Sequence, residues 1–140
     1  GGNIAIKFNA QGSCLPITTA CATSNNEIGE AYRAIKHGYL DAIIAGGAEA
    51  AIVPVGVAGF GNMTALTTCP DPEDACCPFD KRRSGFVMGE GGAALILEEY
   101  EHAKARGARM YAEIVGYGAT DDAHHMTAPD PEGNGGAWHT

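Results

Sequence analysis

Two short, uninterrupted apolar runs constrain the fold of this 140-residue chain more than any other feature. One is Ala-Ile-Ile-Ala at 42–45, within the segment 41–48, and the other is Ala-Ala-Leu-Ile-Leu at 93–97, within the segment 85–98. Runs of this length that are apolar at every position are typical of strands buried on both faces, as in parallel sheets. We therefore predict two buried strands, the first of the parallel type.

A strand, a cysteine and a helix precede the first run. Residues 15–20 are rich in Ile and Thr and predict a short buried strand that ends at Cys21. Apolar residues then recur at three- and four-residue spacing from Ile28 to Ile35, and Gly38 is a suitable C-terminal cap, so this segment predicts a helix. With the strand at 41–48, the unit is β-α-β.

The remaining chain predicts fewer elements. Small and apolar residues at 56–66 favour a short helix. Two prolines and two acidic residues at 70–73 open a long functional loop that continues through residue 78. Residues 100–106 predict a charged helix that ends at Gly107. The alternation at 111–117 predicts a half-exposed strand, and past Gly118 the polar sequence predicts loop or the start of a further helix.

Charge and apolar content argue against two classes of partner. The chain has 9 Lys and Arg against 17 Asp and Glu, a net charge of −8, whereas affinity for nucleic acid depends on basic residues. No apolar stretch approaches the roughly 20 residues needed to cross a bilayer. With 45% hydrophobic and 19% charged residues, the chain is expected to pack as an ordinary globular protein. We expect no nucleic-acid partner and no membrane span.

The cysteines favour a reducing, cytoplasmic location. There are five of them, an odd number without a CxxC pair, which makes a poor disulfide framework. Their spacing does not suit zinc, and His124 and His125 have no further ligand at a usual interval. We predict no metal site and no cofactor. The five are Cys14, Cys21, Cys69, Cys76 and Cys77.

Cys21 is the candidate nucleophile. A thiol where a strand meets a helix lies at the positive end of the helix dipole, which favours the thiolate and attack on an acyl carbonyl or thioester. The backbone N–H groups that follow can stabilise a developing oxyanion. Spacing alone leaves a second interpretation open, in which Cys21 is simply a small buried residue.

Several motifs in order resemble the β-ketoacyl-acyl carrier protein synthases, and most of all the synthase II type. They are TACATS at 19–24, AGGAE at 45–49, PFDKRRSGFVMGEG at 78–91, RGAR at 106–109 and HMTAP at 125–129. The resemblance covers essentially all of the chain. It implies a thiolase-like fold, an α/β architecture layered α-β-α-β-α, of which this chain would supply most of the N-terminal half and the start of the C-terminal half.

The resemblance also implies a reaction. Cys21 accepts the growing acyl chain as a thioester, malonyl carrier protein decarboxylates, and its carbanion attacks that thioester. Acyl carrier protein, in its acyl and malonyl forms, is the implied partner, and homodimers are implied in which the strand at 15–20 pairs across a two-fold axis. Phe60 matches a residue of the acyl pocket and Phe86 a gating phenylalanine; ordinary core packing is the alternative for both.

The chain departs from the family pattern at two positions and lacks further motifs. Ser84 stands where the family usually has Asp, and Thr64 stands where an arginine that helps to dock carrier protein is common. The family's catalytic histidines and lysine have no counterpart here, since His124, His125 and His139 do not match their motifs. We therefore expect the middle of a synthase about three times as long, inactive as this segment alone.

We expect residues 1–108 to belong to the N-terminal β-ketoacyl synthase half and residues 109–140 to begin the C-terminal half. Two alternatives to a fatty-acid synthase stay open. One is a ketosynthase domain of a polyketide synthase, and the other is a non-catalytic partner subunit that controls chain length. Retention of Cys21 with its Thr-Ala and Ala-Thr-Ser neighbours favours an enzyme, because a scaffold has no use for the thiolate.

Overall fold

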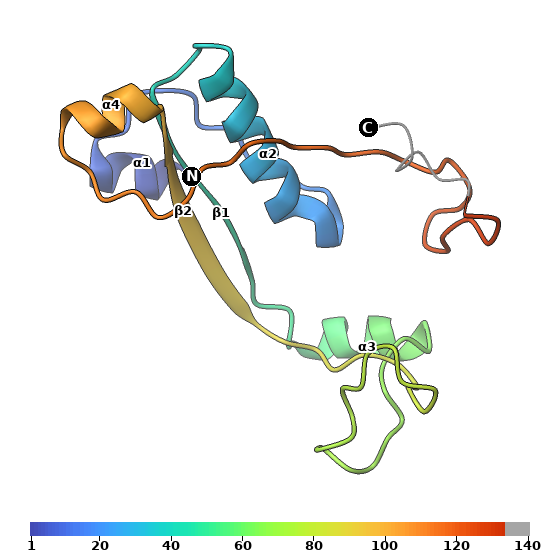
Figure 1. The fold of residues 1–140 in the computed structure, drawn as a ribbon. Coiled ribbons are helices and arrows are strands. Elements are labelled where there is room, and N and C mark those ends of the chain that lie inside the picture. The colour runs from blue at the N-terminus through green and yellow to red at the C-terminus, as the bar shows by residue number, and fades with distance from the viewer. Residues whose placement is uncertain (134–140) are drawn as a thin grey trace. The chain divides into compact units, whose positions relative to one another are not determined.

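The computed structural model describes residues 1–133, so His139 lies outside the described residues. Its chain divides into two compact units, one formed by residues 1–46 with the chain from 94 onward, and the other by residues 47–93. The elements, in chain order, are α1 (Gly2–Phe8), the short 3-10 helix η1 (Ala20–Ala22), α2 (Thr23–Lys36), β1 (Ala42–Glu49), α3 (Pro54–Asn62), β2 (Gly91–Glu98) and α4 (Tyr100–Ala105) (Figure 1).

Strands β1 and β2 pair with each other, and both were predicted (Figure 1). They run antiparallel: the N–H of Glu99 donates to the carbonyl of Asp41 at 2.9 Å beyond one end, and a Cβ on Gly92 would lie 3.2 Å from that of Ala48 near the other. The expectation of a parallel, fully buried first strand is wrong for this pair. The second strand, β2, was also predicted to be buried, but it is exposed from residue 91 to 96 and only Leu97 is buried. Within this part of the chain an apolar run therefore encodes neither the direction of a strand nor its burial.

The first unit has its core between α2 and the paired strands. Ala31 of α2 lies against Ala45 of β1 and Leu97 of β2, and all three are buried. The partly buried side chains around them come from the apolar face of α2 and from β1, namely Ile28, Tyr32, Ile35 and Ile43. The predicted helix is confirmed, and its amphipathic face is the one that covers the sheet.

Helix α2 ends as its sequence predicts. Gly38 has φ +73°, a left-handed conformation that glycine adopts without steric cost. The N–H of Gly38 donates to the carbonyl of Ile35 at 3.0 Å and that of Tyr39 to the carbonyl of Ala34 at 2.9 Å, the bonds of a glycine-capped helix end. This cap turns the chain from α2 into β1.

Two predicted strands are absent from the described residues. Residues 15–20 and 111–117 have no regular secondary structure apart from Ala20, which begins η1. Their alternating or β-branched patterns satisfy one requirement of a strand, but a strand also needs a neighbour to complete its ladder of hydrogen bonds. Within residues 1–133 neither segment has one.

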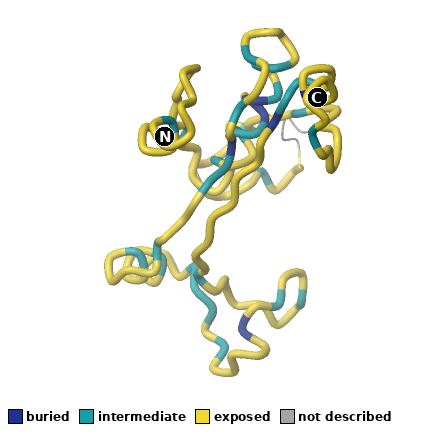
Figure 2. The backbone as a smooth tube through the Cα atoms, turned by 90° about the vertical axis from the view of Figure 1, so that its left-hand side faces the viewer, coloured by how far each residue is buried: buried dark blue, intermediate teal, exposed yellow. Residues whose placement is uncertain are grey.

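The second unit carries α3 and the long loop that the prolines predict. α3 overlaps the region expected to be a short helix, but it begins two residues earlier and ends four residues earlier, and α4 of the first unit matches the predicted charged helix. Most residues are exposed or half-buried; Figure 2 shows the few buried positions, of which Ala75 is in this second unit. Among residues 1–133 no helix combines the length and apolar character that crossing a bilayer requires.

Candidate active site

Cys21 lies in the middle of η1, directly before the first turn of α2. The turn is closed by two backbone hydrogen bonds, from the N–H of Ala22 to the carbonyl of Thr19 at 3.1 Å and from the N–H of Thr23 to the carbonyl of Ala20. The Cys21 side chain is exposed within this chain. The expected junction with a helix N-terminus is confirmed, although the segment before it is not a strand.

The backbone before Cys21 is strained. Ala20 has φ +49°, in the left-handed region that costs a residue with a Cβ about 1–2 kcal/mol. Such strain persists where surrounding contacts hold it, and it concentrates at functional sites. One of these contacts is local, because the N–H of Thr19 donates to the Thr23 hydroxyl at 2.8 Å. The turn is thus held in a conformation that its own residues disfavour.

The turn is open to chemistry at the N-terminus of α2. The first N–H groups of a helix have no partner within the helix, and their partial positive charge favours an anion placed beside them. No acidic side chain lies in the first turn of α2 to oppose this field. An exposed thiol at this position can therefore serve as a nucleophile, with backbone donors next to it for the oxyanion that forms.

Phe60 and Phe86 meet in the second unit. Phe60 lies on α3, and its ring packs edge to face against that of Phe86, with 5.1 Å between ring centroids and 82° between planes. This geometry suits the quadrupoles of two aromatic rings. Phe86 remains 42% exposed, so its ring is not filling a closed core. The structure thus brings together the two aromatic residues that the sequence singled out, and it leaves one of them accessible.

The backbone of Phe86 is fixed by pairing with the chain after α3. Leu66 and Phe86 form an isolated parallel bridge: the N–H of Phe86 donates to the carbonyl of Ala65 at 3.0 Å, and the N–H of Thr67 donates to that of Phe86 at 2.9 Å. Gly85 makes this approach possible. Its φ is +149°, and a Cβ there would lie 2.4 Å from the carbonyl carbon of Leu66.

Ser84 extends the same connection. Its hydroxyl accepts from the N–H of Thr68 and shares a hydrogen bond with the hydroxyl of Thr67, both at 3.0 Å. This contact was not foreseen, because the sequence only marked Ser84 as the substitute for an acidic residue. No pattern in the sequence places it opposite Thr67. The short hydroxyl side chain here ties two backbone segments together, one of which carries Phe86.

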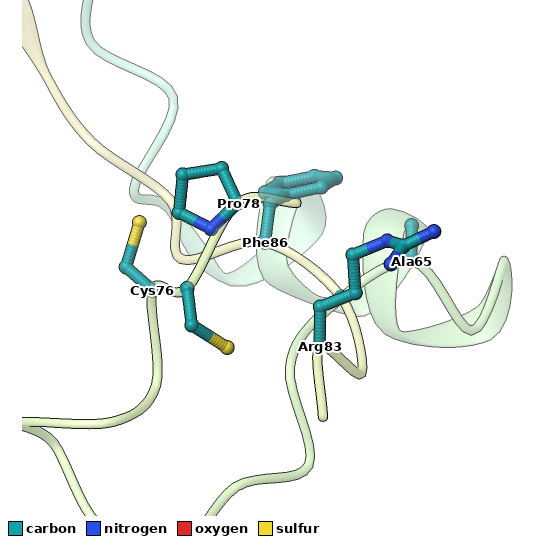
Figure 3. A pocket seen from close by; sticks show the side chains of 7 residues that line it. Ala65, Cys76, Pro78, Arg83 and Phe86 are labelled. Carbon is teal, nitrogen blue, oxygen red and sulfur yellow. The ribbon is translucent and has the colours of Figure 1, made fainter. Parts of the chain in front are cut away.

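A pocket of about 440 Å³ lies beside this bridge, within the second unit (Figure 3). Phe86 and Pro78 give it apolar walls, and Arg83 adds a guanidinium. Its full lining is Ala65, Cys76, Cys77, Pro78, Arg83, Gly85 and Phe86. The predicted long loop therefore contributes to a hollow next to the aromatic pair.

Charges around the pocket are partly paired. Arg82 forms ion pairs with Asp80 at 3.1 Å and Asp74 at 3.3 Å. Hydrogen bonds from the Arg82 side chain and backbone hold the pKa of Asp80 below its ordinary value. Arg83 instead donates to the backbone carbonyl of Asp80 at 2.9 Å, and no carboxylate pairs with it within the described part of the chain.

Other predicted features can be placed as well. Thr64, the position without the docking arginine, is exposed with φ +55°, and its hydroxyl donates only to the carbonyl of Met63. His124 and His125 are exposed in the polar segment after 118. Among residues 1–133, no three or more His, Cys, Asp or Glu side chains group in a way that suits a metal ion.

Comparisons with known proteins agree on one family. The sequence model described as "Beta-ketoacyl synthase, N-terminal domain" matches residues 1–103. The 3-oxoacyl-[acyl-carrier-protein] synthase 2 of Vibrio cholerae is 53% identical over 137 residues, which are 97% of this chain and 33% of that protein. The same-named enzyme of Staphylococcus aureus is 52% identical over 136 residues, with 97% and 34% covered. The chain thus spans about a third of the length of these curated relatives.

Solved structures match as well, at lower sequence identity. A β-ketoacyl synthase from Burkholderia phymatum superposes with a TM-score of 0.81 at 43% identity, covering 91% of this chain and 31% of that one. A ketosynthase of a type II polyketide synthase, solved with its acyl-carrier protein and a bound hexaketide, gives a TM-score of 0.87 at 41% identity, covering 90% and 31%.

Proposed function

Because the chain belongs to the β-ketoacyl synthase family, we propose that it is part of a 3-oxoacyl-acyl carrier protein synthase of fatty-acid biosynthesis, with Cys21 as its nucleophile. The matched ketosynthase structures confirm the expected α/β, thiolase-like fold, of which this chain is a part. The single observation that carries the proposal is the exposed Cys21 thiol on a strained turn at the N-terminus of α2.

The proposed reaction has two halves. The Cys21 thiolate attacks the carbonyl of an acyl thioester on carrier protein, a new C–S bond forms, and the carrier thiol leaves. Malonyl carrier protein then loses carbon dioxide, and its carbanion attacks the Cys21 thioester and expels the thiolate. Both attacks pass through an oxyanion, which backbone N–H donors at the turn would stabilise. Covalent catalysis of this kind divides one difficult step into two easier ones.

Phe60 and Phe86 are proposed to line the path of the acyl chain. Their edge-to-face contact and the partial exposure of Phe86 support this role, because an apolar ring with one free side offers contact to an alkyl chain. The backbone of Phe86 is fixed, so gating would come from rotation of its side chain.

Acyl carrier protein is the proposed partner, in acyl and malonyl forms, and a match to a ketosynthase solved with its carrier protein supports it. We further propose a cytoplasmic homodimer in which residues 15–20 pair across the two-fold axis. Residues 1–108 would belong to the N-terminal half and residues 109–140 would begin the C-terminal half. The residues that assist decarboxylation have no match here, so this chain alone is expected to be inactive.

A polyketide ketosynthase is the second candidate, favoured by the polyketide synthase among the structural matches. A non-catalytic subunit is the third, since a ketosynthase/chain length factor structure also matches, with a TM-score of 0.83 at 40% identity. Turnover separates all three. A fatty-acid synthase extends the acyl group with two carbons from malonyl carrier protein and releases a 3-oxoacyl product. A polyketide enzyme retains the product for repeated extension. A scaffold subunit does neither.

The test is to map acylation in the full-length protein. After incubation with an acyl thioester, mass spectrometry of peptides is expected to find the acyl group on Cys21. Cys14→Ser is the matched control, because it removes another exposed thiol of the same unit, and it should leave acylation intact. Cys21→Ser should abolish extension, since a hydroxyl without a dedicated base is a poor nucleophile. Acylation of any other cysteine with Cys21 free would refute the assignment.

A further inference from the structure

A chain of three hydrogen-bonding side chains connects the Cys21 turn to a residue about 90 positions away. The hydroxyl of Thr19 donates to Oδ1 of Asn26 at 2.6 Å, and Nδ2 of Asn26 donates to the hydroxyl of Tyr117, also at 2.6 Å. Thr19 precedes η1 and Asn26 lies in the first turns of α2. All three residues belong to the first unit.

Tyr117 forms one end of this series of hydrogen bonds, and its ring is held in place by two contacts. Its ring lies against α2 at Gly29, so closely that a Cβ on Gly29 would come within 2.1 Å of a ring carbon. The guanidinium of Arg33, one turn further along, stacks at 5.0 Å from the ring centroid. A rigid aromatic ring with a cation on it and a helix backbone beneath it gives the hydroxyl a fixed position.

The other end of this series of hydrogen bonds is Thr19, next to a strained residue that needs restraint. Ala20 holds a left-handed φ of +49°, which its side chain disfavours, and the local bond from the N–H of Thr19 to the Thr23 hydroxyl is the contact that α2 itself supplies. Through Asn26, Tyr117 adds a second restraint on Thr19, this time on its side chain. Both restraints act on the residue from which η1 starts.

From this geometry we propose that Tyr117 is a positioning residue for Cys21: through Asn26 and Thr19 it holds the strained turn in register with the N-terminus of α2. The inference builds on the proposed role of Cys21 as nucleophile. Tyr117 has no part in the chemistry itself. Losing its hydroxyl would let Thr19 move and the Ala20 strain relax, so the thiol would lose its alignment with the first N–H groups of α2, the donors next to it.

The experiment compares Tyr117→Phe with Tyr32→Phe in the full-length protein. Tyr32 is a matched control because it joins α2 to the same segment, donating to the carbonyl of Val115 at 3.2 Å, but it is outside the chain to Thr19. Two readouts are measured for each variant: the pH dependence of Cys21 alkylation by iodoacetamide, followed by peptide mass spectrometry, and kcat and KM for acyl extension.

Tyr117→Phe is expected to slow Cys21 alkylation near neutral pH by about three- to tenfold, the factor that one hydrogen bond between neutral groups contributes, and to lower kcat with KM unchanged. Tyr32→Phe should leave both readouts at wild-type values. Asn26→Ala should match Tyr117→Phe, and the double variant should show no further loss, because both changes break one chain. Thr19→Ser keeps the hydroxyl and should retain wild-type rates.

Equal alkylation rates in Tyr117→Phe and wild type would overturn the proposal, and so would equal losses in Tyr117→Phe and Tyr32→Phe, which would indicate general loosening of α2. The two hypotheses can fail separately. If the wild-type protein does not extend acyl groups but Tyr117→Phe still slows Cys21 alkylation selectively, the enzyme assignment fails and the positioning role stands.

Discussion

Gly29→Ala tests the packing on which the Tyr117 contact depends. In an ordinary helix this change is stabilising by about 1 kcal/mol, because alanine has the higher helix propensity. Gly29 is buried in the middle of α2, where a Cβ would come 2.1 to 2.3 Å from three atoms of the Tyr117 ring. Gly29 is the only glycine in α2, and the Tyr117 ring beside it accounts for a residue without a Cβ at this position.

The balance can be worked from those contacts. Overpacking of this kind costs about 1–3 kcal/mol. Set against a propensity gain of about 1 kcal/mol, Gly29→Ala alone should be neutral to destabilising by about 2 kcal/mol. In a Tyr117→Ala background the ring is gone, so only the propensity gain of about 1 kcal/mol remains. The coupling between the two sites is therefore expected to be about 1–3 kcal/mol, with a change of sign between backgrounds.

Hydrogen exchange of the α2 amides in the full-length protein measures this coupling, since it reports the free energy of opening of that helix. Four proteins are compared: wild type, each single variant and the double variant. If Gly29→Ala slowed exchange equally in both backgrounds, Tyr117 would not lie on Gly29, and the proposed positioning of the Cys21 turn would lose its anchor.

Two further predictions follow from single contacts. Gly85 has φ +149°, and Gly85→Ala would place a Cβ 2.4 Å from the backbone of Leu66, so this variant should destabilise the protein by about 2 kcal/mol or more and impair acyl extension. The control is Gly59→Ala in α3, whose Cβ meets nothing within 4 Å, so its effect on stability should be neutral or favourable. Thermal unfolding and turnover are measured for both variants. The hydrogen bond from Arg106, reinforced by His102, lowers the pKa of Glu98 from 4.5 to about 2, so the stabilisation it gives is complete above pH 4.5 and is lost as the pH falls towards 2. Glu98→Gln should therefore lower the unfolding temperature at pH 7 and flatten its fall in acid, and the exposed Glu101→Gln should leave the wild-type profile unchanged.

The sequence predicts the elements that local physics decides. The 3.6-residue period of α2, its glycine cap at Gly38 and the two apolar strands depend on neighbours within a few positions, and all appear in the structure. The cysteine at the head of α2 was found in the same way, because thiol and helix start are adjacent in the chain. The comparisons then agreed with the family that its flanking motifs resemble.

Contacts between distant segments were not predictable. Tyr117 and Asn26 are separated by 91 positions, and nothing in either neighbourhood indicates that their side chains meet. The same is true of Ser84 and Thr67, and of the antiparallel direction of β2 relative to β1. In each case the information resides in which backbone segments lie side by side, whereas periodicity records only which face of a segment is buried.

The two segments that were predicted as strands but have no regular structure are both connected to the Cys21 turn. Residues 15–20 enter it directly, and Tyr117 at the end of 111–117 is hydrogen-bonded to it through Asn26. Each has a strand-like pattern with large apolar side chains that stand in the open, since Leu15 is 78% exposed and Val115 is 81% exposed. Unpaired backbone beside exposed apolar side chains invites pairing with another strand. We therefore expect both segments to be completed by further chain, residues 15–20 by the second subunit of the proposed dimer, so that assembly and the geometry of the nucleophile would be established together.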